Sequence, residues 1–295
     1  MKRRNFIKDI AIGSVLFNVS PRLFAQEKKY PDLALVQGDS PAAITKEVLS
    51  MLGGIKRFVS KGDKVLIKPN IGWDRTPEQG ACTNPEVVSS LVDLCLGAGA
   101  KEVKVMDNPC NPARRTYVRS GIAKAAKDAG AKVPYPNKYH LKKIPLKGEW
   151  LKEWEVYSDF LEADKLINVP AAKTHSLSRL TLGMKNWLGA LGGNRNQLHQ
   201  NLDAAMIDLS SFFKPVLTVL DAYRLLLRNG PQGGSLSDVK VYKTIVAGVD
   251  YVAVDALGTT FFGIKPEELR FLQLAAQKGH GKINLESLNI EKRKI

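Results

Sequence analysis

The densest group of residues that could carry chemistry lies between positions 168 and 186. Lys173 and His175 follow the apolar run at 166–169, and Lys185 and Asn186 come shortly afterwards. Ammonium and amide groups can bind an oxyanion, and an imidazole can transfer protons near neutral pH. This pattern predicts a polar site in which Lys173 and His175 are catalytic. A structural histidine with satisfied hydrogen bonds is the alternative for His175.

Further polar residues follow other apolar runs. Asp107 ends the run at 103–106 and is the third predicted catalytic residue, unless it only braces the turn there. Thr83 and Asn84 precede a helix, where they either cap it or present groups to an anion at its positive end. The residues predicted to bind a ligand are Lys68, Asn70, Thr83, Asn84, Lys185, Asn186, Arg228 and Asp255.

The sequence contains only weak indications of a metal or cofactor site. His199 and Asp203 have the i, i+4 spacing of a helix face, but no HExxH-like pattern supports a metal site. The remaining candidate metal ligands are His175, Asp107, Asp208, Asp221 and Asp255. The glycines around Trp187 lack the spacing of a P-loop or a dinucleotide-binding fingerprint. The metal, the cofactor and the reaction therefore stay unassigned.

Strand-like runs that alternate with helical segments must position these residues. This alternation predicts an α/β fold in one large domain, residues 26–295, with a mainly parallel central sheet flanked by helices. We predict strands at 33–36, 65–68, 103–106, 166–169, 216–220 and 244–247, and helices at 45–59, 85–98, 117–129, 202–213, 251–262 and 266–278. An irregular insert or small hairpin layer is predicted near 132–157, and a long loop at 224–240.

In an open α/β sheet, ligands bind outside the carboxyl ends of the strands. The polar segments follow different predicted strands, so we expect them to meet at one edge of the sheet. The sequence therefore predicts a polar cleft at that edge, although it does not name the reaction.

The charge of the chain favours anionic partners. The net charge is +15, and the first 25 residues hold five basic residues and one acidic residue, so their removal leaves +11. The basic residues are scattered and no nucleic-acid-binding motif is present, so the predicted ligand is an anionic small molecule and no nucleic acid.

Three cysteines exclude an iron-sulfur cluster held by four thiolates of this chain. Cys82 and Cys110 fall in loops at the same predicted sheet edge. They either form one disulfide in an oxidising compartment or remain free thiols.

The first 25 residues have the pattern of a twin-arginine signal. Arg3 and Arg4 precede Phe6, Ile7 and Lys8, and a mildly apolar segment follows. About twenty apolar residues are needed to cross a membrane, so this segment predicts no transmembrane helix. We expect the twin-arginine machinery to export the chain to the periplasm or beyond. The alternative is a basic amphipathic start that packs on the domain or lies on a membrane surface.

Several of these segments together resemble the family catalogued as domain-of-unknown-function family 362, some of whose members carry a fused ferredoxin module. The resemblance rests on VLIKPN at 65–70, TNP at 83–85, NVPAAKTH at 168–175, GMKN at 183–186, RNGP at 228–231 and GVDYVAVD at 248–255. It implies an α/β domain and no established reaction. The chain lacks the extra cysteines of a ferredoxin module, so cluster binding is not carried over.

Together these observations predict an exported small-molecule enzyme that acts on an anionic ligand. The alternative is an exported protein that binds a cofactor, metal or redox partner without turnover. Tight stoichiometric binding with no product would favour that alternative.

Overall fold

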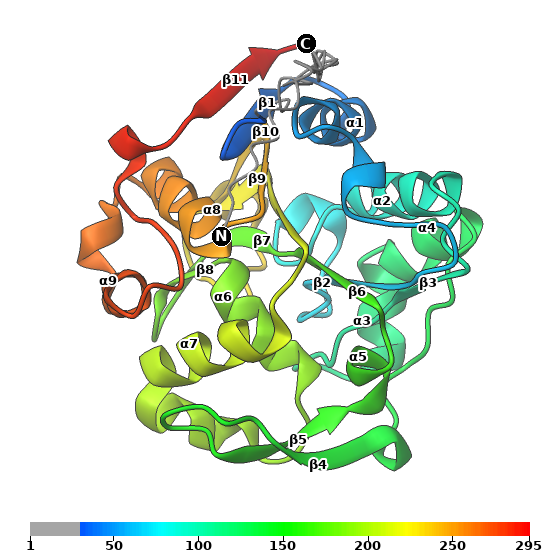
Figure 1. Cartoon of the computed structure of the whole chain (residues 1–295), viewed down its shortest axis with the longest axis vertical. Helices are drawn as coiled ribbons and strands as arrows, with labels where there is room; N and C mark the ends of the chain where they lie inside the picture. Colours follow the sequence, from blue (N-terminus) through cyan, green and yellow to red (C-terminus); the bar gives the residue numbers. More distant parts are fainter. Residues whose placement is uncertain (1–29) are drawn as a thin grey trace, which may run out of the picture.

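The computed structural model describes residues 30–295, and a nine-stranded sheet lies at the centre of these residues (Figure 1). Most strand pairs are parallel, and β10 runs antiparallel to both of its neighbours. A short hairpin of β7 (Ala171–His175) and β8 (Arg179–Thr181) joins the sheet where β7 pairs with β9. The main strand order is β11 (Ile290–Lys294), β1 (Leu33–Gln37), β10 (Val239–Gly248), β9 (Leu217–Leu226), β6 (Lys165–Val169), β2 (Lys64–Pro69) and β3 (Glu102–Val105).

Helices cover both faces of this sheet and enclose two hydrophobic cores. Successive side chains of a strand point to opposite faces, so Leu66 of β2 packs in one core while Val65 and Ile67 pack in the other. One face carries α1 (Pro41–Met51), α2 (Pro85–Gly97), α3 (Ala113–Arg119) and α4 (Ile122–Asp128). The other carries α6 (Gly183–Asn186), α7 (Leu202–Phe213), α8 (Tyr251–Thr259) and α9 (Arg270–Gln277). The predicted α/β class is confirmed.

The helices predicted at 117–129 and 45–59 differ from the observed ones in length and bounds. The predicted helix at 117–129 is broken at Gly121, whose φ of 73° ends α3 and begins α4. The predicted helix at 45–59 instead begins at Pro41, after the capping side chain of Ser40, and ends at Met51. Glycines with positive φ at positions 53 and 54 follow this helix and direct the chain away from its axis.

The largest departure concerns β9 and β10. The sequence predicts strands at 216–220 and 244–247 and a loop at 224–240, but both strands are longer and form an antiparallel hairpin. The connecting segment therefore covers only residues 227–238. Strands β7, β8 and β11 were not predicted.

The predicted insert is a two-stranded antiparallel sheet of β4 (Leu141–Pro145) and β5 (Glu153–Tyr157). The short helix α5 (Ser158–Leu161) follows it. Asp208 of α7 fixes the turn of this hairpin, because its carboxylate accepts hydrogen bonds of 2.8–3.0 Å from the backbone N–H groups of Glu149, Trp150 and Leu151. This predicted metal candidate is thus a structural acceptor.

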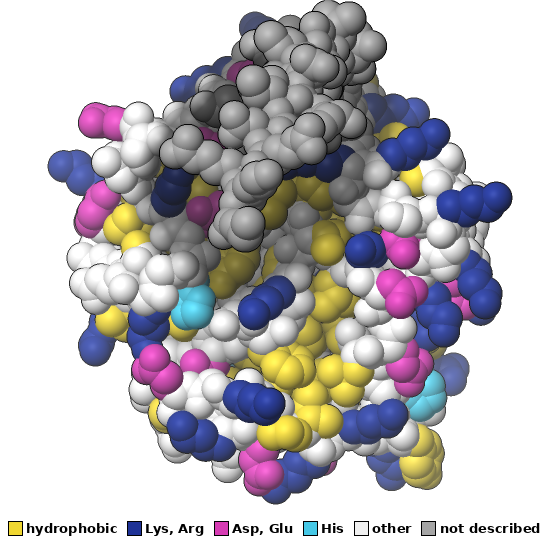
Figure 2. Space-filling model, in the orientation of Figure 1, with side chains coloured by type: hydrophobic (Ala, Val, Ile, Leu, Met, Phe, Trp, Pro, Cys, Tyr) yellow, Lys and Arg dark blue, Asp and Glu magenta, His cyan; other side chains and the backbone are white. Residues whose placement is uncertain are grey.

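The predicted export signal, residues 1–25, lies outside the described residues. Between residues 30 and 295, no helix has both the length and the apolar character needed to cross a membrane. Lys and Arg side chains are spread around the visible face, with Asp and Glu among them (Figure 2). This distribution agrees with the scattered positions of the basic residues in the sequence.

Candidate functional site

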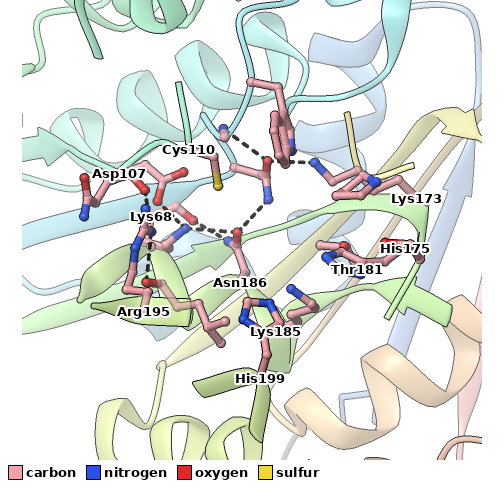
Figure 3. Close-up of a pocket in the computed structure, with 18 of the residues that line it drawn as sticks. Lys68, Asp107, Cys110, Lys173, His175, Thr181, Lys185, Asn186, Arg195 and His199 are labelled. Atoms are coloured by element: carbon pink, nitrogen blue, oxygen red, sulfur yellow. Dashed lines mark hydrogen bonds and ion pairs between the residues drawn. The ribbon is translucent and has the colours of Figure 1, made fainter. Parts of the chain in front are cut away.

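A cavity of about 490 Å³ brings together residues from β2, β7, β8, α6 and the segments after β3 and α6 (Figure 3). Its lining includes seven predicted site residues, which are Lys68, Asn70, Asp107, Lys173, His175, Lys185 and Asn186. In Figure 3, Lys68, Asp107 and Arg195 lie at one side, Lys173, His175 and Thr181 at the other, and Asn186 between them. The expected convergence at one sheet edge therefore occurs for these seven residues.

Lys68 and Asp107 form a buried ion pair at one side of the cavity. The Lys68 Nζ atom lies 2.7 Å from Asp107 Oδ1, and the two side chains are 1% and 3% exposed. Lys68 Nζ also donates to Asn186 Oδ1 at 3.0 Å, and Asp107 Oδ2 accepts a hydrogen bond from the backbone N–H of Ile71 at 2.6 Å. Burial lowers the pKa of Lys68, while the charge of Asp107 opposes that shift.

Lys173 on β7 is buried without a carboxylate partner among residues 30–295. Its Nζ atom donates to Asn70 Oδ1 at 3.1 Å and to the carbonyl oxygen of Ala81 at 2.5 Å. Burial lowers the pKa of Lys173 to about 8, because neutral acceptors compensate the lost hydration of an ammonium only in part.

Lys185 on α6 is half-buried, and its Nζ atom has no hydrogen-bond or ion-pair partner in the described part of the chain. Burial lowers its pKa to about 8, and the neighbouring charge of Lys173 adds to the shift. Asp255 of α8 holds the start of α6, since its carboxylate accepts from the backbone N–H groups of Gly183 at 2.6 Å and Met184 at 2.8 Å. Lys185 thus extends from a short helix whose first turn is held by the Asp255 carboxylate.

His175 has a defined protonation pattern. Its Nδ1 atom accepts a hydrogen bond from the backbone N–H of Leu177 at 3.0 Å, which places the proton of a neutral ring on Nε2. Burial, followed by the charge of Lys185, lowers the pKa of His175 to about 3. At neutral pH this ring is therefore neutral and can donate a hydrogen bond from Nε2. Because Nδ1 already accepts a hydrogen bond, the ring can offer the cavity a proton donor at Nε2, which is one of the two roles, acid or base, that the sequence left open.

Four predicted ligand-binding residues lie outside the cavity lining. Thr83 donates to the carbonyl oxygen of Val169 at 2.7 Å and accepts from the backbone N–H of Asn70 at 2.8 Å, so it positions Asn70. Asn84 caps α2, and Arg228 pairs with Asp238 at 3.2 Å. Asp255, the fourth, is committed to α6. Their side-chain hydrogen bonds and ion pairs are to the protein itself, so the structure places these four residues in the framework around the cavity and not in its lining.

Arg195 and Thr181 line the cavity without having been predicted, whereas Cys110 was predicted only as a loop cysteine at this sheet edge and His199 only as a metal candidate. Arg195 donates to the carbonyl oxygens of Asn108 at 2.8 Å and Pro109 at 3.0 Å, so it connects two cavity loops and has no carboxylate partner between residues 30 and 295. The Thr181 side chain is buried, and its hydroxyl has no hydrogen-bond partner among the described residues. No local motif marks Arg195 or Thr181, because each reaches the cavity only through the folded path of the chain.

The lining is cationic. Among the described residues, the lining contains the basic side chains of Lys68, Lys173, Lys185 and Arg195 and one carboxylate, that of Asp107. Within residues 30–295, no three His, Cys, Asp or Glu side chains are grouped closely enough to hold a metal ion.

All three cysteines are free thiols. Cys82 is buried and donates to the carbonyl oxygen of Trp73 at 3.2 Å, while Cys110 is exposed at the cavity. Of the two alternatives for Cys82 and Cys110, the structure shows unpaired thiols.

Comparison with known proteins agrees with the resemblance seen in the sequence. The chain belongs to the family described as "Domain of unknown function (DUF362)", whose model matches residues 65–260. It is 25% identical over 260 residues to the "Thylakoid-associated protein sll1697" of Synechocystis sp. (strain ATCC 27184 / PCC 6803 / Kazusa), with 83% of this chain and 76% of that protein covered.

Among solved structures, the chain is similar to the lactate racemase apoprotein from Thermoanaerobacterium thermosaccharolyticum. The TM-score is 0.48 and the sequence identity 13%, with 77% of this chain and 56% of that chain covered. The chain thus spans little more than half of that neighbour.

Proposed function

We propose that this member of the DUF362 family is an enzyme that binds a small anionic ligand, with a carboxylate or phosphate group, in the cavity of about 490 Å³. The observation that carries the proposal is the charge of the lining. Four cationic side chains face one carboxylate, and that carboxylate already pairs with Lys68. An anion would supply the charge-assisted hydrogen bonds that Lys185 and Thr181 do not make within the described chain.

Catalysis is favoured over simple binding by the state of the ionisable groups. Burial lowers the pKa of Lys173 and of Lys185 to about 8, and a neutral imidazole lies beside them. Amines that titrate near neutral pH can exchange protons or act as nucleophiles, and such groups concentrate at active sites.

Calorimetric titration with oxalate and with inorganic phosphate tests the binding step. We expect saturable binding by the wild-type protein and a loss of about tenfold or more in Lys185→Met, because a hydrogen bond to a charged group contributes about 1.5–3 kcal/mol. The control is Lys101→Met, which removes one exposed positive charge remote from the cavity lining. Equal affinities in the two variants would argue against the proposed site.

The natural ligand decides between enzyme and binding protein. Mass spectrometry and metal analysis of protein purified from its own compartment would identify a bound molecule, and a time course by NMR would then follow its conversion. Stoichiometric binding with an unchanged ligand favours the accessory-protein alternative. Formation of a product that requires Lys173 favours the enzyme.

Export by the twin-arginine pathway is the proposed route of the chain. We expect the paired Arg3→Lys and Arg4→Lys variant to accumulate in the cytoplasm, because the receptor recognises the guanidinium pair and not charge alone. Arg22→Lys, which changes an arginine of the same segment outside the pair, is the control. Fractionation of cells that express each variant provides the measurement, and equal export of both would refute this route.

A further inference from the structure

We propose that the ligand carries a carbonyl group beside its anionic group, as a 2-oxo acid does, and that Lys185 joins this carbonyl carbon as an imine. The inference rests on the proposed function, since it concerns the same cavity and adds a covalent step and a substrate class. It follows from differences between the three lysines and from the donors opposite Lys185.

The three lysines of the cavity differ in their partners. Lys68 is held by the Asp107 carboxylate at 2.7 Å, which stabilises an ammonium that has no lone pair for attack. Lys173 donates to two oxygen acceptors of the protein. Lys185 has no partner within residues 30–295 and is the amine that can turn to a ligand without breaking a hydrogen bond of the protein.

The electrostatic surroundings keep part of Lys185 neutral. Burial, with the charges of Lys173 and Arg195, lowers its pKa to about 8 from an ordinary 10.5. At pH 7.5 about a quarter of the amine is then neutral, against about one part in a thousand for an unperturbed lysine. A desolvated lysine beside another cation is a general route to an amine nucleophile.

The hairpin β7–β8 supplies a site for the anionic group. Lys173 and Thr181 are directly opposite each other in its register, and His175 lies two residues after Lys173 on the same strand. Side chains with this spacing share one face of a hairpin. Figure 3 shows Lys173, His175 and Thr181 together on this side of the cavity.

These three residues offer different hydrogen-bond donors. Thr181 is 4% exposed and its hydroxyl has no partner in the described chain, which is unfavourable for a buried polar group unless a ligand accepts from it. His175 offers Nε2–H and Lys173 an ammonium. In the proposed complex these three donors bind the carboxylate of the ligand, and Lys185 attacks the carbonyl carbon beside it.

The step balances without another reactant. The neutral Lys185 nitrogen attacks the carbonyl carbon, a carbon–nitrogen bond forms, and the carbonyl oxygen takes up protons. One of these protons comes from the nitrogen and the other from solvent, the oxygen leaves as water, and the nitrogen keeps one hydrogen in a protonated imine. No oxidant or reductant is consumed, and a second water molecule reverses the reaction.

Reductive trapping tests the imine. The purified protein is incubated with limiting glyoxylate and cyanoborohydride at pH 8, and intact mass and peptide mapping locate the reduced adduct. We expect one adduct on Lys185, formed about tenfold or more faster than on any exposed lysine, because the exposed amines are almost fully protonated. Thr181→Val should keep the adduct on Lys185 and raise the glyoxylate concentration needed for half-maximal labelling.

Lys185→Arg separates the covalent step from anion binding. Its guanidinium keeps the positive charge but does not form the imine, so we expect no adduct, while oxalate still binds more tightly than to Lys185→Met. Lys185→Met is the second variant, and it should form no adduct and bind oxalate weakly. Thermal unfolding checks that each variant folds.

The outcomes separate the two proposals. Labelling spread over exposed lysines, or unchanged in Lys185→Arg, overturns the imine. Wild-type protein that binds oxalate and forms no glyoxylate adduct also overturns it and leaves the proposed function intact. Protein that binds neither oxalate nor phosphate overturns the proposed function itself.

Discussion

Gly189→Ala is expected to separate the buried ion pair between Lys68 and Asp107. A Cβ at position 189 would lie 1.8 Å from Asp107 Oδ1 and 2.8 Å from Lys68 Nζ, whereas real Cβ contacts essentially never fall below 3.0 Å. The Asp107 carboxylate cannot simply retreat, because its Oδ2 atom is held by the backbone N–H of Ile71 at 2.6 Å and its backbone by the hydroxyl of Tyr117. The methyl group must therefore displace a charge or the backbone.

The expected loss of stability follows from the buried charge that is left without its partner when Lys68 and Asp107 are separated. Removing one partner of a buried ion pair typically costs about 3–5 kcal/mol, because the other charge remains desolvated. Lys68 can shed part of this cost by losing its proton, since burial already lowers its pKa. We therefore expect Gly189→Ala to lower the free energy of unfolding in urea by about 3 kcal/mol and to weaken oxalate binding, because Lys68 lines the cavity.

Two controls isolate the cause. Gly97→Ala adds a methyl group near the end of α2, where nothing lies within 4 Å of the new Cβ, and should be neutral or stabilising by up to about 1 kcal/mol. In an Asp107→Ala background, the cost of Gly189→Ala should fall below about 1 kcal/mol, because the main clash has been removed. An equal cost in both backgrounds would refute the steric argument.

Two further predictions concern the cationic lining. Oxalate affinity should stay constant from pH 6 to 7 and fall above about pH 8, because the pKa values of Lys173 and Lys185 are lowered to about 8 and each loses its charge as the pH rises. Calorimetry measures this, and a flat profile up to pH 9.5 would contradict it. Asp255→Ala should destabilise the fold by about 2–4 kcal/mol and weaken oxalate binding, because two backbone N–H groups at the start of α6 lose their acceptor. The matched control is Asp250→Ala, which removes the cap of α8 outside the cavity lining and should leave oxalate binding unchanged.

Much of the fold was predictable because its strands are short apolar runs between helices with clear boundaries. The predicted helix at 202–213 is α7, and the strand predicted at 166–169 is β6 with one residue added at its start. Strand β9 was cut short because Asp221 resembles a charged residue at a strand end. Asp221 is instead buried within β9, where it accepts from the backbone N–H of Asn84 at 2.6 Å. A partner so distant in sequence leaves no local signal.

The site residues also divide into those with a local sequence signal and those positioned by contacts between distant parts of the chain. Lys68 and Asp107 were predicted because they lie at the carboxyl ends of neighbouring parallel strands, a relation that topology alone imposes. Arg195 and Thr181 depend on the path of a loop and a three-residue strand, which periodicity does not determine. Asp255 was predicted to bind a ligand because it is a carboxylate that lies near the other site residues in the sequence pattern. In the structure it accepts hydrogen bonds at the start of α6, the helix that carries Lys185.

The cationic lining has an electrostatic cost that the proposed anionic ligand would reduce. Lys173 and Lys185 are each desolvated, and the charge of Lys173 further lowers the pKa of Lys185, so protonating both lysines is less favourable in the folded chain than in the unfolded chain. For these groups the unfolded chain binds more protons between about pH 8 and 10.5, so their contribution to stability rises with pH in that window. An anion between the two lysines reverses the sign of this interaction and binds only the folded chain. It should therefore stabilise the protein most at the pH where the lysines are charged, which links the stability of the fold to the ligand that the cavity selects.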